Sequence, residues 1–158
     1  MPEKLHPNAA HVADVLRSHG IESEIVVLAD SAPTAATAAA QLGCEIGAIA
    51  NSLIFNADDA PLLVLTSGAH RVNTDLVAAL VGARKVRRAT PEFVREHTGQ
   101  PIGGVAPIGH PAPVRTLVDT WLDEHETVWA AAGHPHTVFA TTYGELLKIT
   151  GGTAAEVG

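Results

Sequence analysis

Residues 99–109 read Gly-Gln-Pro-Ile-Gly-Gly-Val-Ala-Pro-Ile-Gly, a run of glycine and proline inside otherwise ordinary globular sequence. Gly103 and Gly104 have no Cβ, so their backbone can adopt positive φ and a ligand can approach the main chain closely. Pro107 fixes its own φ and disfavours helix at the residue before it. The run therefore predicts a stiff backbone wall that binds a small polar group through main-chain hydrogen bonds. A plain turn between two strands is the alternative, and this segment alone favours the turn.

Further segments, in a fixed order, change that weighting. Residues 34–55 combine an alanine-rich stretch ending at Gly43 with an apolar run, which is typical of a helix followed by a strand. The remaining segments are Leu62-Leu-Val-Leu-Thr-Ser-Gly68, Arg71-Val-Asn73, Thr98-Gly99, Gly103-Gly-Val-Ala-Pro-Ile-Gly109 and Ala131-Ala-Gly133. In this order and spacing, from about residue 5 to residue 149, the chain resembles the YbaK/EbsC family. That family is similar to the editing domain inserted in bacterial prolyl-tRNA synthetases.

The resemblance implies an activity and a set of site residues. The family hydrolyses the ester that links a wrong amino acid to the 3′ end of a tRNA. Main-chain groups of its Gly-x-x-x-Pro element, here Gly103 to Pro107, hold the aminoacyl group, and the tRNA ribose hydroxyl helps to activate water. By resemblance, the catalytic residues are Asn51 and Gly103, and the substrate-binding residues are Ser67, Gly68, Gly104, Pro107, Ala131, Ala132 and Gly133.

Two positions depart from the family pattern. Most members carry lysine where this chain has Asn51, and some carry serine in place of Ala131. Asparagine retains hydrogen-bonding groups but has no charge, so it cannot supply a cation to a phosphate. Two hypotheses remain open. One is a free-standing aminoacyl-tRNA deacylase, and the other is a catalytically weakened or inactive homologue that binds a tRNA end or an aminoacyl compound.

The charge distribution bears on a nucleic-acid partner. The formal net charge of −7 is unfavourable for a protein that binds phosphates. The basic residues are unevenly distributed, however, and several of them cluster between residues 84 and 95. This cluster can hold a tRNA acceptor stem, or it can guard a strand edge against aggregation. The expected partners are the acceptor end of tRNA and, as a second candidate, an aminoacyl-tRNA synthetase. Five of the ten basic residues form the cluster: Arg84, Lys85, Arg87, Arg88 and Arg95.

Length and cysteine usage bear on domain organisation and compartment. The length of 158 residues predicts a single domain over residues 1–158. The single cysteine, Cys44, excludes an internal disulfide and fits a reducing compartment, and we expect it as a small buried apolar side chain. The N-terminus lacks a signal-peptide pattern, and no apolar run is long enough to span a membrane. We therefore expect a cytoplasmic protein without membrane contact.

Other candidate chemistry is sparse. His134 and His136 flank a proline, which favours a turn, and no third ligand is evident, so no metal site is predicted and a metal hydrolase ranks low. The glycines lack the strand–turn–helix context of a dinucleotide fingerprint, and no cofactor is predicted. His110 lines the pocket mouth or lies on the surface. Asp119 sits within a strand pattern and faces either the pocket or, more commonly for such a residue, the solvent.

The periodicity predicts an α+β fold. The expected sheet is mixed, mainly antiparallel, curved and barrel-like, with about seven strands surrounded by helices, because hairpins outnumber crossovers in the middle of the chain. Ser31 or Thr34 is expected to cap the second helix, and residues 151–158 are expected to be frayed or to form a short helical turn. The expected helices are 7–19, a second one that begins after Ser31 or Thr34 and ends at 42–43, 74–81, 91–97 and a last one that begins at Thr141 or Thr142 and extends to about 149. The expected strands are 23–28, 46–55, 61–66, 85–88, 114–122, 127–132 and 137–141.

Overall fold

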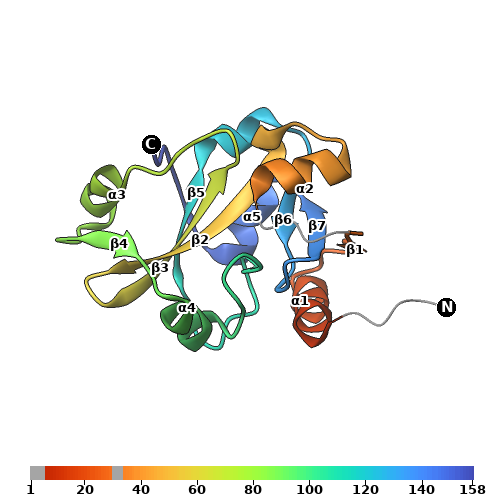
Figure 1. Cartoon of the computed structure of the whole chain (residues 1–158), viewed down its shortest axis with the longest axis horizontal. Helices are drawn as coiled ribbons and strands as arrows, with labels where there is room; N and C mark the ends of the chain where they lie inside the picture. The colour runs from red at the N-terminus through yellow and green to blue at the C-terminus, as the bar shows by residue number, and fades with distance from the viewer. Residues whose placement is uncertain (1–5, 30–33) are drawn as a thin grey trace.

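The computed structural model describes residues 6–29 and 34–158, which form one mixed sheet with helices on both faces (Figure 1). The five α-helices of this part of the chain are α1 (Pro7–Ser18), α2 (Ala35–Leu42), α3 (Thr74–Val81), α4 (Pro91–Thr98) and α5 (Tyr143–Thr150). The eight strands are β1 (Ile25–Val27), β2 (Ile49–Ala57), β3 (Ala60–Ser67), β4 (Val86–Arg88), β5 (Arg115–Asp119), β6 (Val128–Ala131), β7 (Thr137–Thr141) and β8 (Thr153–Ala155).

The helix ends follow the capping residues in the sequence. Thr34, Asn73, Thr90 and Thr142 each accept a hydrogen bond from a backbone N–H in the first turn of the helix that follows. Glycines end α2, α3, α4 and α5 in the left-handed conformation that glycine adopts without steric cost. The predicted helices are therefore confirmed to within about two residues at each end. Ser31, the other candidate cap for α2, lies outside the described residues.

The sheet differs from the prediction in three respects. Its strand order is β1-β7-β6-β2-β3-β5-β8, with β4 paired to β2, so it has eight strands and is open. The pairs β2–β6, β3–β5 and β5–β8 are parallel, and the other four pairs are antiparallel. The expectation of a mixed sheet surrounded by helices is therefore confirmed. The expectation that this sheet is mainly antiparallel and barrel-like is wrong, and β8 adds one strand to the seven that the sequence predicts. Periodicity identifies strands, but it does not show which strand a chain returns to after a crossover.

Three segments were assigned to the wrong kind of structure. Residues 151–158 were expected to be frayed or helical, but Thr153–Ala155 forms β8 and pairs with β5. The predicted strand 46–55 begins with a 3₁₀ turn, η1 (Ile46–Ala48). The predicted strand 114–122 stops at Asp119 and continues as a second 3₁₀ turn, η2 (Thr120–Glu124). A short apolar run is compatible with both a strand and a turn, so the sequence pattern does not locate the start of β2 or the end of β5.

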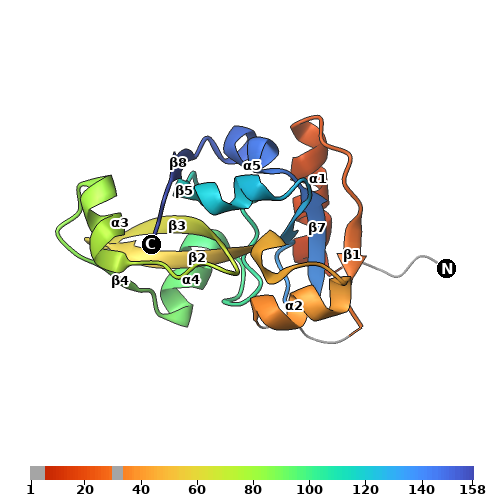
Figure 2. The ribbon, with the colours of Figure 1, turned by 90° about the horizontal axis from the view of Figure 1, so that it is seen from above.

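The two faces of the sheet carry different helices. In Figure 2, α1 and α5 lie on one side of the long β2–β3 hairpin and α2 lies on the other. Ala50 and Ile54 of β2 belong to the larger buried cluster with residues of α1, α4 and α5. Ile49 packs with α2, and Phe55 packs with α3. Because side chains alternate along a strand, Asn51 lies on the α2–α3 face and Ser52 on the opposite one.

Candidate functional site

The sheet has a gap along one edge of β2. On that edge β6 pairs with Ile49 and Ala50 only, and β4 pairs with β2 only from Phe55 onward. Residues 51–54 therefore have β3 on one side and no strand of the described part of the chain on the other. Figure 1 shows β6 and β4 at opposite ends of β2. A pocket of about 440 Å³ lies at this gap, and all of residues 49–55 contribute to its lining.

The rest of the pocket comes from segments far apart in the sequence. Ala35 and Ala38 of α2 supply one apolar wall, and Ile102 and Gly103 of the glycine-rich run supply another. Trp129 of β6 also lines the pocket. Two exposed cations, Arg71 and Arg88, also line the pocket, and neither forms an ion pair with a carboxylate of the described residues. The site is an apolar pocket with positive charge at its solvent side.

The structure brings three of the candidate site residues together. Asn51, Gly103 and Ala131 all line the pocket. The carboxamide of Asn51 is half-buried and has no hydrogen-bond partner among the described residues. Gly103 has φ of +88°, and a Cβ built on it would meet no atom within 4 Å. Both residues therefore offer free polar backbone or side-chain groups to a ligand.

The other six candidates lie outside the pocket lining. A Cβ on Gly104 would come within 2.7 Å of the backbone of His134 and Pro135, so this glycine permits a close packing of two loops. A Cβ on Gly68 would clash with the Ile46 carbonyl oxygen. Ser67, Pro107 and Ala132 are buried, and Gly133 accepts a hydrogen bond at its carbonyl from the Asn8 carboxamide.

The glycine-rich run is held by a residue that the sequence did not single out. Gln100 is buried; its Oε1 accepts from the Ala106 N–H at 2.7 Å, and its Nε2 donates to the Ile108 carbonyl at 3.3 Å. His110 Nε2 lies 2.8 Å from the Ala106 carbonyl oxygen. These contacts close the run into a rigid loop behind Gly103. A polar side chain inside an apolar Gly/Pro run is the signal that marks such a clamp.

His110 gives this loop a pH dependence. Burial lowers the pKa of His110 from its ordinary value of 6.5, although its hydrogen bond to Ala106 acts in the opposite direction. A histidine whose folded-state pKa is depressed stabilises the fold above the unfolded pKa and loses that contribution as the pH falls. We expect the free energy of unfolding to decrease between pH 7 and pH 5, and His110→Gln to reduce that slope. Urea unfolding at several pH values measures it, and an unchanged slope in the variant contradicts the assignment.

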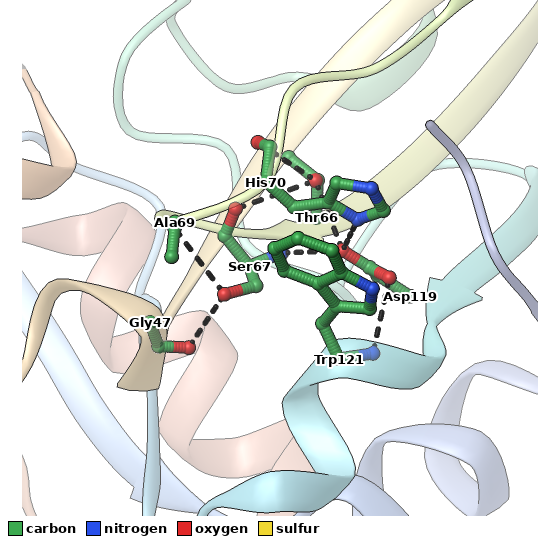
Figure 3. A network of polar contacts seen from close by, with 7 residues as sticks. All are labelled: Gly47, Thr66, Ser67, Ala69, His70, Asp119 and Trp121. Carbon is green, nitrogen blue, oxygen red and sulfur yellow. Dashed lines mark hydrogen bonds and ion pairs between the residues drawn. The ribbon is translucent and has the colours of Figure 1, made fainter.

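A second buried network lies behind the loop that follows β3 (Figure 3). Asp119 is fully buried rather than on the solvent-exposed face, and it does not line the pocket. Its Oδ2 accepts from Ser67 N–H at 3.0 Å and Thr66 Oγ1 at 3.2 Å, and lies 2.9 Å from His70 Nδ1. Its Oδ1 accepts from the Trp121 N–H at 3.1 Å. The sequence reasoning missed this role, because a lone aspartate in a strand pattern carries no signal of its partners.

The network is structural rather than nucleophilic. Ser67 Oγ donates to the Gly47 carbonyl at 2.8 Å and makes no hydrogen bond to His70, so the three side chains do not form a Ser-His-Asp relay. The His70 ring stacks on Trp121 with ring centroids 3.6 Å apart and an interplanar angle of 4°. Because Arg71 follows His70 directly, this network fixes the turn that carries a pocket cation.

The remaining candidates form no site of their own. His134 Nδ1 accepts from the His136 N–H, and in the described residues no group of three His, Cys, Asp or Glu side chains is placed to hold a metal ion. Cys44 is half-buried beside α2, and burial raises the pKa of its thiol, as expected for an unreactive side chain. None of the described helices has the length and apolar character that crossing a membrane requires.

Comparisons with known proteins agree on one family. A family model described as an aminoacyl-tRNA editing domain matches residues 29–149. YwhH of Bacillus subtilis (strain 168), an uncharacterised protein, is 29% identical over 130 residues, which are 82% of each chain. The proline–tRNA ligase of Levilactobacillus brevis is 30% identical over 91 residues, which are 58% of this chain and 16% of the ligase. A crystal structure of a protein proposed to be a trans-editing enzyme for prolyl-tRNA synthetase superposes with a TM-score of 0.90 at 39% identity, covering 98% of both chains.

Proposed function

We propose, because this chain belongs to the aminoacyl-tRNA editing domain family, that it is a free-standing deacylase that hydrolyses the ester of a mischarged tRNA. The observation that carries the proposal is the pocket itself. It combines an accessible main chain at Gly103 with an Asn51 carboxamide and two arginines that have no hydrogen-bond or ion-pair partner, respectively, among the described residues. A tRNA 3′ end presents the matching groups, namely an acyl ester, ribose hydroxyls and phosphates. We further propose that residues 1–158 act as one editing domain in the cytoplasm.

The pocket suits a reaction that needs positioning more than a strong base. An aminoacyl ester is already activated, so donors near the developing oxyanion and a correctly placed water lower the barrier substantially. In the proposed complex the Gly103 loop and β2 hold the acyl group, and the adjacent ribose hydroxyl assists water, as the family resemblance implies. Arg71 and Arg88 lie where terminal phosphates would approach, which supplies the positive charge that Asn51 lacks. The partner in this proposal is a tRNA acceptor end, with a link to prolyl-tRNA synthetase.

The decisive experiment is a deacylation assay on a panel of mischarged tRNAs. We expect the purified protein to release at least one non-cognate amino acid faster than the spontaneous rate. The folded protein failing on every aminoacyl-tRNA contradicts the proposal. A second candidate, a binding module without turnover, is favoured by the neutral Asn51 alone. Saturable binding of a non-hydrolysable aminoacyl-adenosine without any deacylation supports that candidate.

Substitutions at Asn51 test the positioning mechanism. We expect Asn51→Ala to reduce kcat/KM by about tenfold at most, because one neutral hydrogen bond contributes roughly 0.5–1.5 kcal/mol. Asn51→Lys is expected to preserve or raise activity, since a cation there meets the phosphate or ribose end of the tRNA. Steady-state deacylation kinetics measure both. Complete loss of turnover in Asn51→Ala, with the fold intact, makes Asn51 indispensable and contradicts this mechanism.

A further inference from the structure

The pairing register of β2 shows which main-chain groups face the gap. Gly68 N–H donates to the Ile49 carbonyl, and Ile49 and Gly68 stand opposite each other in the antiparallel β2–β3 register. In such a ladder, every second residue directs both its N–H and its C=O toward the partner strand. Asn51 and Leu53 therefore point their backbone groups to β3. Ser52 and Ile54 point theirs to the opposite edge.

Two of these outward groups are suitably placed for one ligand. The β6 ladder ends at Ala50 and the β4 ladder begins at Phe55, so the Ser52 carbonyl and the Ile54 N–H lie between them. No backbone or side-chain hydrogen bond to either group occurs among the described residues. Both residues line the pocket. Polar backbone groups that are enclosed in this way require a partner from water or from a ligand.

We propose that the aminoacyl group binds here by extending the sheet as a single residue. Its α-ammonium donates to the Ser52 carbonyl, and the Ile54 N–H donates to its ester carbonyl oxygen. One residue of a strand that runs parallel to β2, placed opposite Leu53, would make the same two hydrogen bonds. β6 already pairs with this edge of β2 in the parallel direction. Main-chain recognition of this kind supplies affinity without depending on the ligand's side chain. The inference rests on the proposed function and names the groups of the protein that hold the substrate.

The length of the gap limits the ligand to a small one. Four residues, 51–54, separate the two flanking ladders, and a strand rises about 3.3 Å per residue. An extended peptide would meet the ends of β4 and β6, whereas one aminoacyl unit fits between them. The same bond places the ester carbonyl beside an N–H donor, where negative charge develops during hydrolysis. Ile54 therefore acts through its backbone, and its side chain remains in the core.

The test follows single backbone amides in the ¹⁵N-labelled intact chain. The probe is 3′-(L-alanylamino)-3′-deoxyadenosine, a non-hydrolysable analogue that retains the ammonium and the carbonyl. We expect a downfield shift of the Ile54 amide proton on saturation, and hydrogen exchange there slowed by about tenfold, the factor that one net hydrogen bond supplies. The Leu53 amide, which points to β3, is the internal control and is expected to keep its exchange rate.

A second ligand tests the ammonium contact. The 3′-propionylamino analogue keeps the carbonyl but lacks the α-ammonium, and we expect it to bind about tenfold more weakly, because a charge-assisted hydrogen bond is lost. Binding that leaves the Ile54 amide unchanged, equal affinity for the two analogues, or no saturable binding of the first analogue each overturns the inference. Deacylation of tRNA without a change at the Ile54 amide refutes this mode of binding and leaves the proposed function standing. An Ile54 response without deacylation refutes the proposed function instead.

Discussion

Asp119→Ala is expected to destabilise the protein by about 3–5 kcal/mol, the cost of removing one partner from a buried polar network. The substitution leaves two N–H groups without their acceptor, the buried one of Ser67 and the partly buried one of Trp121. Each buried donor that loses its partner costs roughly 1–3 kcal/mol. The free energy of unfolding, measured by urea titration with circular dichroism, reports the loss directly.

Two control variants separate this effect from a change in charge. Asp123 lies in the η2 turn that Asp119 caps, and it is exposed, so Asp123→Ala removes the same charge without breaking the network. This control is expected to change stability by less than about 0.5 kcal/mol. Asp119→Asn keeps the shape and one acceptor oxygen, and we expect an intermediate loss. Equal stability of Asp119→Ala and Asp123→Ala contradicts the structural role of Asp119. If Asp119→Ala does not fold, the free energy of unfolding of Asp119→Asn is compared with that of Asp123→Ala instead.

The helices could be predicted from local signals, whereas the sheet could not. A cap such as Asn73 and a terminator such as Gly82 act on their own turn of helix, so the residues and the structure lie a few positions apart. Strand pairing is set by distant contacts. The parallel β3–β5 pair joins segments some fifty residues apart, and nothing local in either one specifies the other. The short β8 was missed for the same reason, because its order comes from pairing with β5.

The candidate site likewise combines residues that the sequence indicates with residues that only the folded chain reveals. Asn51, Gly103 and Ala131 were selected through a family resemblance, and the fold places all three at one pocket. Arg71 belongs to the quoted segment Arg71-Val-Asn73 and Arg88 to the basic cluster, but only the folded chain shows that both line this pocket. Gln100 is marked in the sequence only as a polar side chain inside a Gly/Pro run, and Asp119 carries no signal of its own, because the role of each depends on several backbone partners at once. The gap beside Ser52 and Ile54 is likewise a property of the pairing register.

Gly103→Val is expected to abolish deacylation while the protein stays folded, which is a far larger effect on activity than that of Asn51→Ala. An added Cβ at Gly103 meets open space, and this residue lines the pocket, so a branched side chain would occupy volume that the aminoacyl group requires. We expect kcat/KM to fall by more than about a hundredfold, since loss of correct positioning alone can cost that factor. Deacylation kinetics together with the thermal midpoint measure the two consequences separately.

Backbone strain needs its own control, because valine at φ of +88° is unfavourable wherever it occurs. Gly20 has φ of +76°, a Cβ on it also meets no atom within 4 Å, and it ends α1 away from the pocket lining. Gly20→Val therefore introduces similar strain without obstructing the pocket, and we expect a comparable loss of stability with activity retained. Equal loss of activity in the two variants would show that strain, rather than occupation of the pocket, is responsible. Full activity in Gly103→Val, with Asn51→Ala inactive, would instead move the acyl group away from the glycine-rich loop, because a bound substrate and the valine side chain cannot share that space.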